Sequence, residues 1–204
     1  MRPLFTSPHP PEYTVTKAYS KRQIMDYTYD RAAAVAYAMR WAYRRNPLFF
    51  DFSEIGGNCT NFTSQCILAG CCTMNFTETF GWYYVSPEDR APSWTGVEYL
   101  YNFLTSNEDV GPFGEEADVS RLTGGDVVQL ADENGDFYHT LFVVGADLGE
   151  PILAAQTNDA FARPLSSYSY GTARGIHILG YRRGSPPCLC FASLYNGESL
   201  LDCL

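Results

Sequence analysis

Gly56-Gly57-Asn58-Cys59-Thr60-Asn61-Phe62-Thr63-Ser64-Gln65-Cys66 is the stretch of sequence that decides how this chain folds. The two glycines permit a tight turn, and asparagine is a preferred residue at a helix N-cap. Apolar residues then recur at helical spacing as far as Gly70, so the pattern predicts a helix that begins at Cys59. At such a position the unpaired amide groups and the helix dipole favour a thiolate. Cys59 is therefore the candidate nucleophile.

A cysteine nucleophile needs a base, and the chain offers three histidines. His9 lies in a proline-rich segment and His177 in an Ile-His-Ile alternation, whereas His139 lies in the run 137–144, which reads as a buried strand. A cysteine that opens a helix, followed by a histidine on a core strand, is the order found in papain-like hydrolases. Taken singly, Cys59 and His139 also fit inert core residues. Their pairing favours a catalytic dyad, with the sulfur within about 4 Å of the ring.

These residues also resemble the bacterial putative amidase domain family, which is similar to the papain-like cell-wall peptidases and CHAP-type amidases. The resemblance extends from about Tyr27 to about Tyr181 and is most specific around Cys59. It is carried also by Tyr29-Asp30-Arg31, Asn46-Pro47, Gly81-Trp82-Tyr83-Tyr84, Ser93-Trp94-Thr95, Gly125-Asp126 and His139. The resemblance implies a papain-like α+β fold, in which N-terminal helices, including the nucleophile helix, pack on an antiparallel sheet of about four to six strands.

The chain departs from the family pattern at two positions. Asn58 stands where the family usually has Asp, and Gln156 stands where a His is usual. Gln156 is thus the first candidate for the third catalytic residue, which orients the imidazole. Asn158 is the alternative, because two residues along a strand share a face and either amide can reach His139.

Three further residues are candidates for substrate binding. Asn58 precedes the nucleophile, and the position of Trp82 and Trp94 in the resemblance suggests a groove that holds an extended peptide. The other interpretation of the two tryptophans is that they are ordinary core aromatics.

The resemblance implies a cysteine amidase or peptidase that acts on an amide or a small peptide, for example one derived from the bacterial cell wall, through an acyl-thioester. An acyltransferase shares the first half-reaction, so the sequence does not separate the two. A peptide-binding module that has lost catalysis is a third hypothesis, which the two departures and the C-terminal tail support, whereas the presence of both Cys59 and His139 argues against it.

Composition limits the partners. The chain has 14 basic and 23 acidic residues, a net charge of −9, and its basic clusters are no larger than Arg44-Arg45 and Arg182-Arg183. We therefore expect no nucleic acid partner and no anionic membrane surface. The spacing of Cys188 and Cys190 does not match a zinc motif, and no phosphate loop or other cofactor motif occurs, so we expect neither metal nor cofactor. The oligomeric state is not predictable.

The seven cysteines are an odd number and include the adjacent pair Cys71-Cys72, which predicts reduced thiols. The first 26 residues contain no apolar run of signal-peptide length, and no segment approaches the ~20 apolar residues that a membrane span needs. These features predict a cytoplasmic protein, or an extracellular one if an export signal has been removed.

The predicted organisation is an irregular leader over residues 1–26, an amidase domain over 27–183 and a cysteine-containing tail over 184–204. We expect helices over residues 26–45, 59–70 and 94–104, and an acidic loop over 107–116. Strands are expected over residues 126–130, 137–144, 151–158 and 175–181. Because strands follow helices, the predicted class is α+β with an antiparallel sheet.

Overall fold

The computed structural model describes residues 24–184 and 189–199. Within them the chain forms an α+β fold around one antiparallel sheet of seven strands. The strands are β1 (Met25–Tyr27), β2 (Gly111–Ala117), β3 (Val127–Ala131), β4 (Phe137–Asp147), β5 (Glu150–Ala155), β6 (Ala160–Pro164) and β7 (Thr172–Arg183). The predicted fold class is confirmed at this level.

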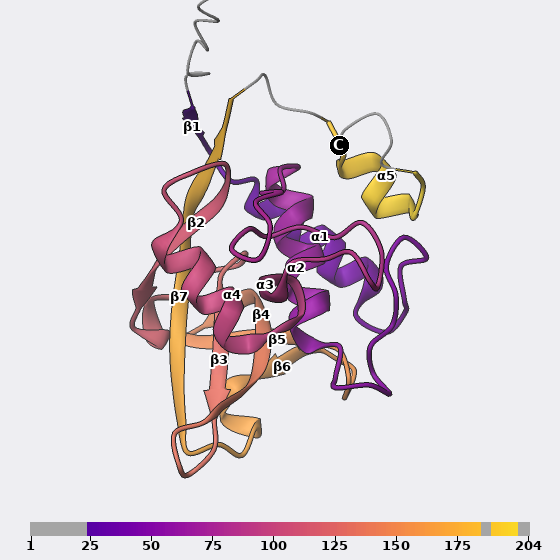
Figure 1. The fold of residues 1–204 in the computed structure, drawn as a ribbon. Helices are drawn as coiled ribbons and strands as arrows, with labels where there is room; N and C mark the ends of the chain where they lie inside the picture. Colours follow the sequence, from indigo (N-terminus) through magenta and orange to yellow (C-terminus); the bar gives the residue numbers. More distant parts are fainter. Residues whose placement is uncertain (1–23, 185–188, 200–204) are drawn as a thin grey trace, which may run out of the picture.

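The long strand β7 connects two parts of the sheet. Its first half pairs with β3, its last three residues pair with β1, and β2 runs along its other edge. From β3 the sheet continues through β4 and β5 to β6. Figure 1 shows β7 extending along one side of the molecule beside β2 and β3.

The helices are α1 (Arg31–Trp41), α2 (Cys59–Cys71), α3 (Pro92–Thr95), α4 (Val97–Ser106) and α5 (Phe191–Asn196), and two short 3-10 turns occur, η1 (Val119–Arg121) and η2 (Leu165–Ser167). Asp30 caps α1, accepting a hydrogen bond from the amide of Ala33. In Figure 1, α1 and α2 lie together beside β4 and β5. None of the helices in the described part of the chain is long and apolar enough to cross a membrane.

The two faces of the sheet have different cores. Val127, Phe142 and Ala154 contribute to the larger core, which includes the buried faces of α1, α2 and α4. Their neighbours Val128, Leu141, Val143 and others point to the opposite face, where they pack with Leu122 and Leu165 next to the 3-10 turns. Each side chain of β3, β4 and β5 is thus assigned to the helix face or the turn face by strand alternation.

Several predicted boundaries are wrong. The sheet has more strands than the four to six expected, because β2 occupies most of the segment predicted as a loop over 107–116. Its glycines and glutamates give no alternating apolar pattern in the sequence, and the strand forms by backbone pairing with β7. Met25 and Asp26, assigned to the leader and the first helix, belong to β1. The helix predicted over 94–104 is two helices, because Gly96 has extended backbone angles.

The prediction of reduced thiols is wrong for one pair of cysteines. Cys72, directly after α2, forms a disulfide with Cys190, directly before α5. Cys59, Cys66 and Cys71 are free and buried, while Cys188 and Cys203 lie outside the described residues. An odd cysteine count does not exclude one bridge, and residues 118 apart in sequence give no local signal for it. The bridge fastens α5 to the C-terminal end of α2.

Candidate active site

Cys59 is the first residue of α2, as predicted, and it lies almost entirely out of contact with solvent. The residue is 8% exposed, and Asn58 and Thr60 beside it are fully buried. Asn58 occupies the N-cap position, but its side chain makes no capping hydrogen bond to the helix. The expectation that Asn58 caps α2 is therefore wrong. Asn58 thus supplies no side-chain acceptor to the first amide groups of the helix, beside the thiol.

The side chain of Asn58 instead holds the preceding loop. Its Oδ1 accepts hydrogen bonds from the amide of Phe52 at 3.0 Å and from Nδ2 of Asn61 at 2.8 Å. Its Nδ2 donates to Oε1 of Gln156 at 2.5 Å. The backbone amide of Asn58 donates to Oγ1 of Thr157 at 2.6 Å. With all of these atoms in use and the residue buried, Asn58 positions the loop, and the structure does not present its side chain to a substrate.

Gln156 lies on the helix face of the sheet and binds the end of α1. Its Nε2 donates to the carbonyl oxygens of Trp41 and Arg44, each at 2.8 Å. Together with the bond from Asn58, these contacts occupy the amide of a residue that is 1% exposed. The prediction that Gln156 turns toward His139 is thus not what the structure shows.

Asn158 is exposed and lies in the turn between β5 and β6. β5 ends at Ala155, so the prediction of a strand as far as Asn158 is wrong. The reason is local: Thr157 has a φ of 96°, which turns the chain out of the strand. Gln156 and Asn158 consequently do not share a strand face.

The two departures from the family pattern are in direct contact. Asn58 and Gln156, which stand where Asp and His are usual, are joined by the 2.5 Å hydrogen bond described above. An aspartate and a histidine in these places would form a charged or readily charged pair next to Cys59. In this chain the pair consists of two neutral amides. The two departures from the family pattern therefore form a single side-chain contact in the folded protein.

The structure joins α2 to β4 at the residues that follow Cys59 and His139, but not through these two side chains. The next residues in the chain, Thr60 and Thr140, are joined by a hydrogen bond of 3.0 Å between their hydroxyl oxygens. Since Thr140 points to the helix face, His139 points to the turn face, as does its pairing partner Leu130. The described residues show no hydrogen bond between Cys59 and His139; the sulfur contacts Oγ1 of Thr60 at 3.8 Å.

On the turn face the imidazole of His139 lies among aromatic rings. The ring centroid of Tyr138 is 6.2 Å away and that of Tyr168 is 6.3 Å away. Burial, together with the positive charge of Arg163, lowers the pKa of His139 from 6.5 to about 4. His139 is therefore neutral at physiological pH, which is the protonation state of a general base.

Trp82 and Trp94 are core residues. Both are fully buried, with ring centroids 4.8 Å apart. The indole nitrogen of Trp82 donates to Oγ of Ser64 and that of Trp94 to Oδ1 of Asn61. Neither ring offers a face to a bound peptide. The proposed groove role is wrong for both, and the interpretation as core aromatics is correct; their indole groups hold the buried polar side of α2 in place.

Other parts of the motif have structural roles as well. Arg31 forms an ion pair of 2.7 Å with the fully buried Asp126. The second carboxylate oxygen of Asp126 lies 2.9 Å from Nδ1 of His177. These contacts join the start of α1 to β3 and β7, and His177 faces this ion pair rather than Cys59. In the described part of the chain no cluster of three or more His, Cys, Asp or Glu residues is arranged to hold a metal ion.

Sequence reasoning missed the threonines that surround the site. Thr60, Thr140 and Thr157 join α2, β4 and the turn after β5 through their hydroxyl groups. Thr60 lies within the stretch 56–66, but no sequence pattern indicates which threonine of a strand will contact it. Thr157 combines a positive φ with a β-branched side chain, a conformation that costs energy and concentrates at functional sites.

Comparisons with known proteins place the chain in a family. A family model described as "Putative amidase domain" matches residues 28–179. A protein of Bacillus subtilis (strain 168), named uncharacterized protein YhbB, is 34% identical over 151 residues, which cover 72% of this chain and 47% of the relative. The chain thus spans about half the length of that relative. No solved structure matches the present chain. The match covers most of the chain, and we conclude that the protein belongs to the putative amidase domain family, whose description indicates amide hydrolysis.

Proposed function

We propose that this protein is a cysteine-dependent amidase or peptidase in which Cys59 attacks the carbonyl carbon of an amide. The carbon–sulfur bond forms as the thiol proton passes to the base, and the carbon–nitrogen bond breaks as the base protonates the departing amine. Water then attacks the acyl-thioester and releases the acid and the free thiol. The substrate class is an amide or small peptide; a peptide derived from the cell wall fits the papain-like resemblance.

The observation that carries the proposal is the uncapped start of α2 at Cys59. The side chain that would normally accept hydrogen bonds from the first helical amides binds Phe52, Asn61 and Gln156 instead. These amides lie beside the sulfur, where a tetrahedral intermediate develops its negative oxygen. Amide groups held in this way, in a buried environment, are effective stabilisers of such an oxyanion.

His139 is the proposed base, and its use requires a movement. The next residue, Thr140, is bonded to Thr60, which follows Cys59, but the ring of His139 packs near Tyr168. His139 lies near the start of β4, and a register shift between Leu130 and Ala131 of the paired strand falls next to it. A local rearrangement there would bring the neutral ring from the turn face to the thiol. Such a change would accompany substrate binding.

The test is site-specific alkylation together with profiling by an electrophilic dipeptide probe. We expect iodoacetamide to label Cys59 before Cys66 and Cys71, which are free and buried and serve as matched controls. His139→Ala should slow labelling by the dipeptide probe, while His177→Ala should not. Labelling of Cys59 no faster than that of Cys71 would overturn the proposal of a catalytic thiol; unchanged probe labelling in His139→Ala would overturn the choice of base.

One set of observations favours a second candidate, an amide-binding module without turnover. The residues at positions 58 and 156 form a neutral pair, and the ring of His139 packs near Tyr168, so neither feature supplies a charge to the thiol. In this case a peptide amide would bind the uncapped helix start, and Cys59→Ala would keep the affinity. Release of free amine by the wild type, lost in Cys59→Ala, would exclude this candidate.

The location of the protein is a separate proposal. The cytoplasmic location expected from the sequence is at odds with the disulfide between Cys72 and Cys190, since such bonds persist in oxidising compartments. We therefore favour an extracellular or other oxidising environment. Mass spectrometry of the native protein after blocking of free thiols would test this; an unbridged Cys72 in protein taken from its own cells would contradict it.

A further inference from the structure

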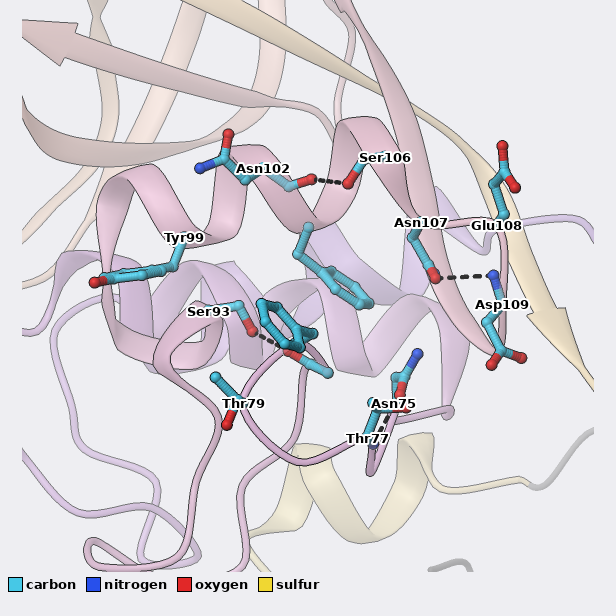
Figure 2. A pocket seen from close by; sticks show the side chains of 13 residues that line it. Asn75, Thr77, Thr79, Ser93, Tyr99, Asn102, Ser106, Asn107, Glu108 and Asp109 are labelled. Carbon is cyan, nitrogen blue, oxygen red and sulfur yellow. Dashed lines mark hydrogen bonds between the residues drawn. The ribbon is translucent and has the colours of Figure 1, made fainter.

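A pocket of about 500 Å³ lies on a different part of the surface from Cys59. It is formed by the loop 75–81, by one residue of α3, by α4 and by the turn over 107–109. Figure 2 shows Tyr99 at one side of it, the turn with Asn107, Glu108 and Asp109 at the other, and Ser93, Thr79, Thr77 and Asn75 along the border between them. Cys59 does not line this pocket, so the inference below does not rest on the proposed catalytic function.

The walls of the pocket are fixed to one another. Asn75 donates to the carbonyl of Val110 at 2.9 Å, which joins the loop to the turn, and Asn107 donates to the carbonyl of Pro112 at 2.9 Å. Ser93 donates to the carbonyl of Gly81 at 2.5 Å, which joins the loop to α3. A pocket whose walls are cross-linked before a ligand arrives loses little entropy on binding.

The loop presents an aromatic ring to solvent at an energetic cost. Phe80 is 84% exposed. It follows Thr79, whose φ of 67° is unfavourable for a β-branched residue. The turn is closed by a hydrogen bond of 2.8 Å from the amide of Gly81 to the carbonyl of Thr77, and Gly81 has no room for a side chain. This turn therefore carries the exposed ring of Phe80 to the border of the pocket.

The chemistry of the lining indicates the charge of the ligand. Two carboxylates, of Glu108 and Asp109, line the pocket, and no Lys, Arg or His is among its lining residues. Asp109 uses Oδ1 to accept a hydrogen bond from the amide of Val110, which leaves the second oxygen for a ligand. The rings of Phe80, Tyr99 and Phe103 line the pocket as well, and its other lining residues are Gly81 and uncharged polar residues. Aromatic faces combined with carboxylates attract organic cations, and the same carboxylates repel anions.

We propose that this pocket binds a protonated amine on an apolar stem, such as a lysine side chain of a peptide. The ammonium group lies at the side of Asp109 and Glu108, and the methylene stem packs on Phe80 toward Tyr99. Figure 2 shows the turn that carries Glu108 and Asp109 at one side of the pocket and Tyr99 at the other, which fits an elongated ligand of this kind.

The experiment is calorimetric titration with Nα-acetyl-lysine methylamide, with its uncharged Nε-acetyl derivative as the matched ligand control. We expect saturable binding of the amine. Its affinity should fall about tenfold when the ionic strength is raised to about 1 M, where the Debye length is about 3 Å. The acetylated form should bind at least about tenfold more weakly than the amine. Phe80→Ala and Asp109→Asn should each weaken binding about fivefold or more. Phe76→Ala, at an exposed neighbour outside the pocket lining, should not.

Shifts of the amide resonances of Gly81 and Asn102 during the titration would place the ligand in this pocket. Equal affinity for the acetylated form, or binding that Phe80→Ala leaves unchanged, would overturn the proposal. So would binding of a neutral methyl glycoside in place of the amine, because the pocket would then recognise hydroxyl groups and not charge.

Discussion

The two ends of α2 are held in opposite ways. At its C-terminal end, Cys72 adopts a left-handed conformation with a φ of 46°, its amide donates to the carbonyl of Leu68, and its sulfur is bonded to Cys190. At its N-terminal end there is no side-chain cap, and a network of amides and threonine hydroxyls holds the loop before Cys59. One end is fixed by a covalent bond, whereas the loop at the other end is held by polar contacts.

This difference separates stability from chemistry within one helix. Every residue of α2 is buried, so the helix keeps its place through its length and its C-terminal anchor. The polar residues around Cys59 at the N-terminal end are therefore less needed to hold the helix in place, and they can serve the reactivity of the thiol. If that division is correct, changes at the C-terminal end alter the free energy of unfolding, and changes at the N-terminal end alter the behaviour of Cys59.

The largest expected effect is at the C-terminal end. Replacing both Cys72 and Cys190 by Ser should lower the free energy of unfolding by about 4 kcal/mol, because the bond closes a loop across 118 positions. Urea unfolding followed by tryptophan fluorescence measures it. Reductant should bring the wild type to the same value and leave the double variant unchanged. A loss below about 1 kcal/mol would mean that packing and not the bridge anchors this end.

The second effect concerns the histidine next to the N-terminal end. The pKa of His139 is about 4 in the folded protein and about 6.5 when unfolded, so protons favour the unfolded chain. The contribution of neutral His139 to the free energy of unfolding is therefore fully present above pH 6.5. It is lost as the pH decreases to 4, by up to about 3 kcal/mol.

Urea unfolding of the wild type and of His139→Gln at a series of pH values checks this prediction. The variant should lack the part of the pH dependence that His139 contributes. Parallel profiles for the two proteins would show that the ring is solvated, and hence free to turn toward Cys59 without cost.

A third, smaller effect tests the network itself. Gln156→Ala removes the donors to Trp41 and Arg44 and the acceptor of Asn58, leaving buried polar groups unpaired. We expect a loss of about 2 kcal/mol in the free energy of unfolding. Asn158→Ala, in the exposed turn two residues away, should change it by less than about 0.5 kcal/mol. Similar effects of the two substitutions would contradict a structural role specific to Gln156.

The sequence predicts the parts of this fold that follow from local periodicity. The start of α2 at Cys59, the strand of His139 and the strand after Gly125 are where the apolar pattern places them. β2 has no such pattern, since its residues include two glycines and two glutamates and its pairing with β7 supplies the structure. The disulfide joins positions that only the folded chain brings together.

The candidate site, too, could be predicted from local sequence patterns only in part. Residue types identify Cys59 and His139, but the face to which His139 points depends on the register of β4 with β3 and on the contact between Thr140 and Thr60. For Gln156, the prediction assumed that β5 continues, whereas Thr157 turns the chain. Strand alternation is reliable only when the end of the strand is known, because one residue more or less reverses a side chain.

The smallest expected effect is also the sharpest test of the N-terminal end. Asn58→Asp alone places a carboxylate oxygen against Oε1 of Gln156, at a position now 2.5 Å away, so the two acceptors repel unless the Gln156 amide rotates away from Trp41 and Arg44. Gln156→His alone removes one of the two donors to those carbonyls. The double variant pairs a carboxylate with an imidazole that can donate to it, so the two changes should compensate each other by about 1 kcal/mol in a double-mutant cycle of unfolding.

The same double variant should increase the rate of Cys59 alkylation by roughly threefold to tenfold over the wild type, since a partly protonated imidazole near the sulfur favours the thiolate. The rise should fade above the pKa of the new histidine, and Cys66, buried in the same helix, should show no change. If the cycle is additive and the alkylation rate is unchanged, then positions 58 and 156 only hold the loop. The neutral pair would in that case have no bearing on whether Cys59 is reactive, and the direction of His139 alone would decide between an amidase and a binding module.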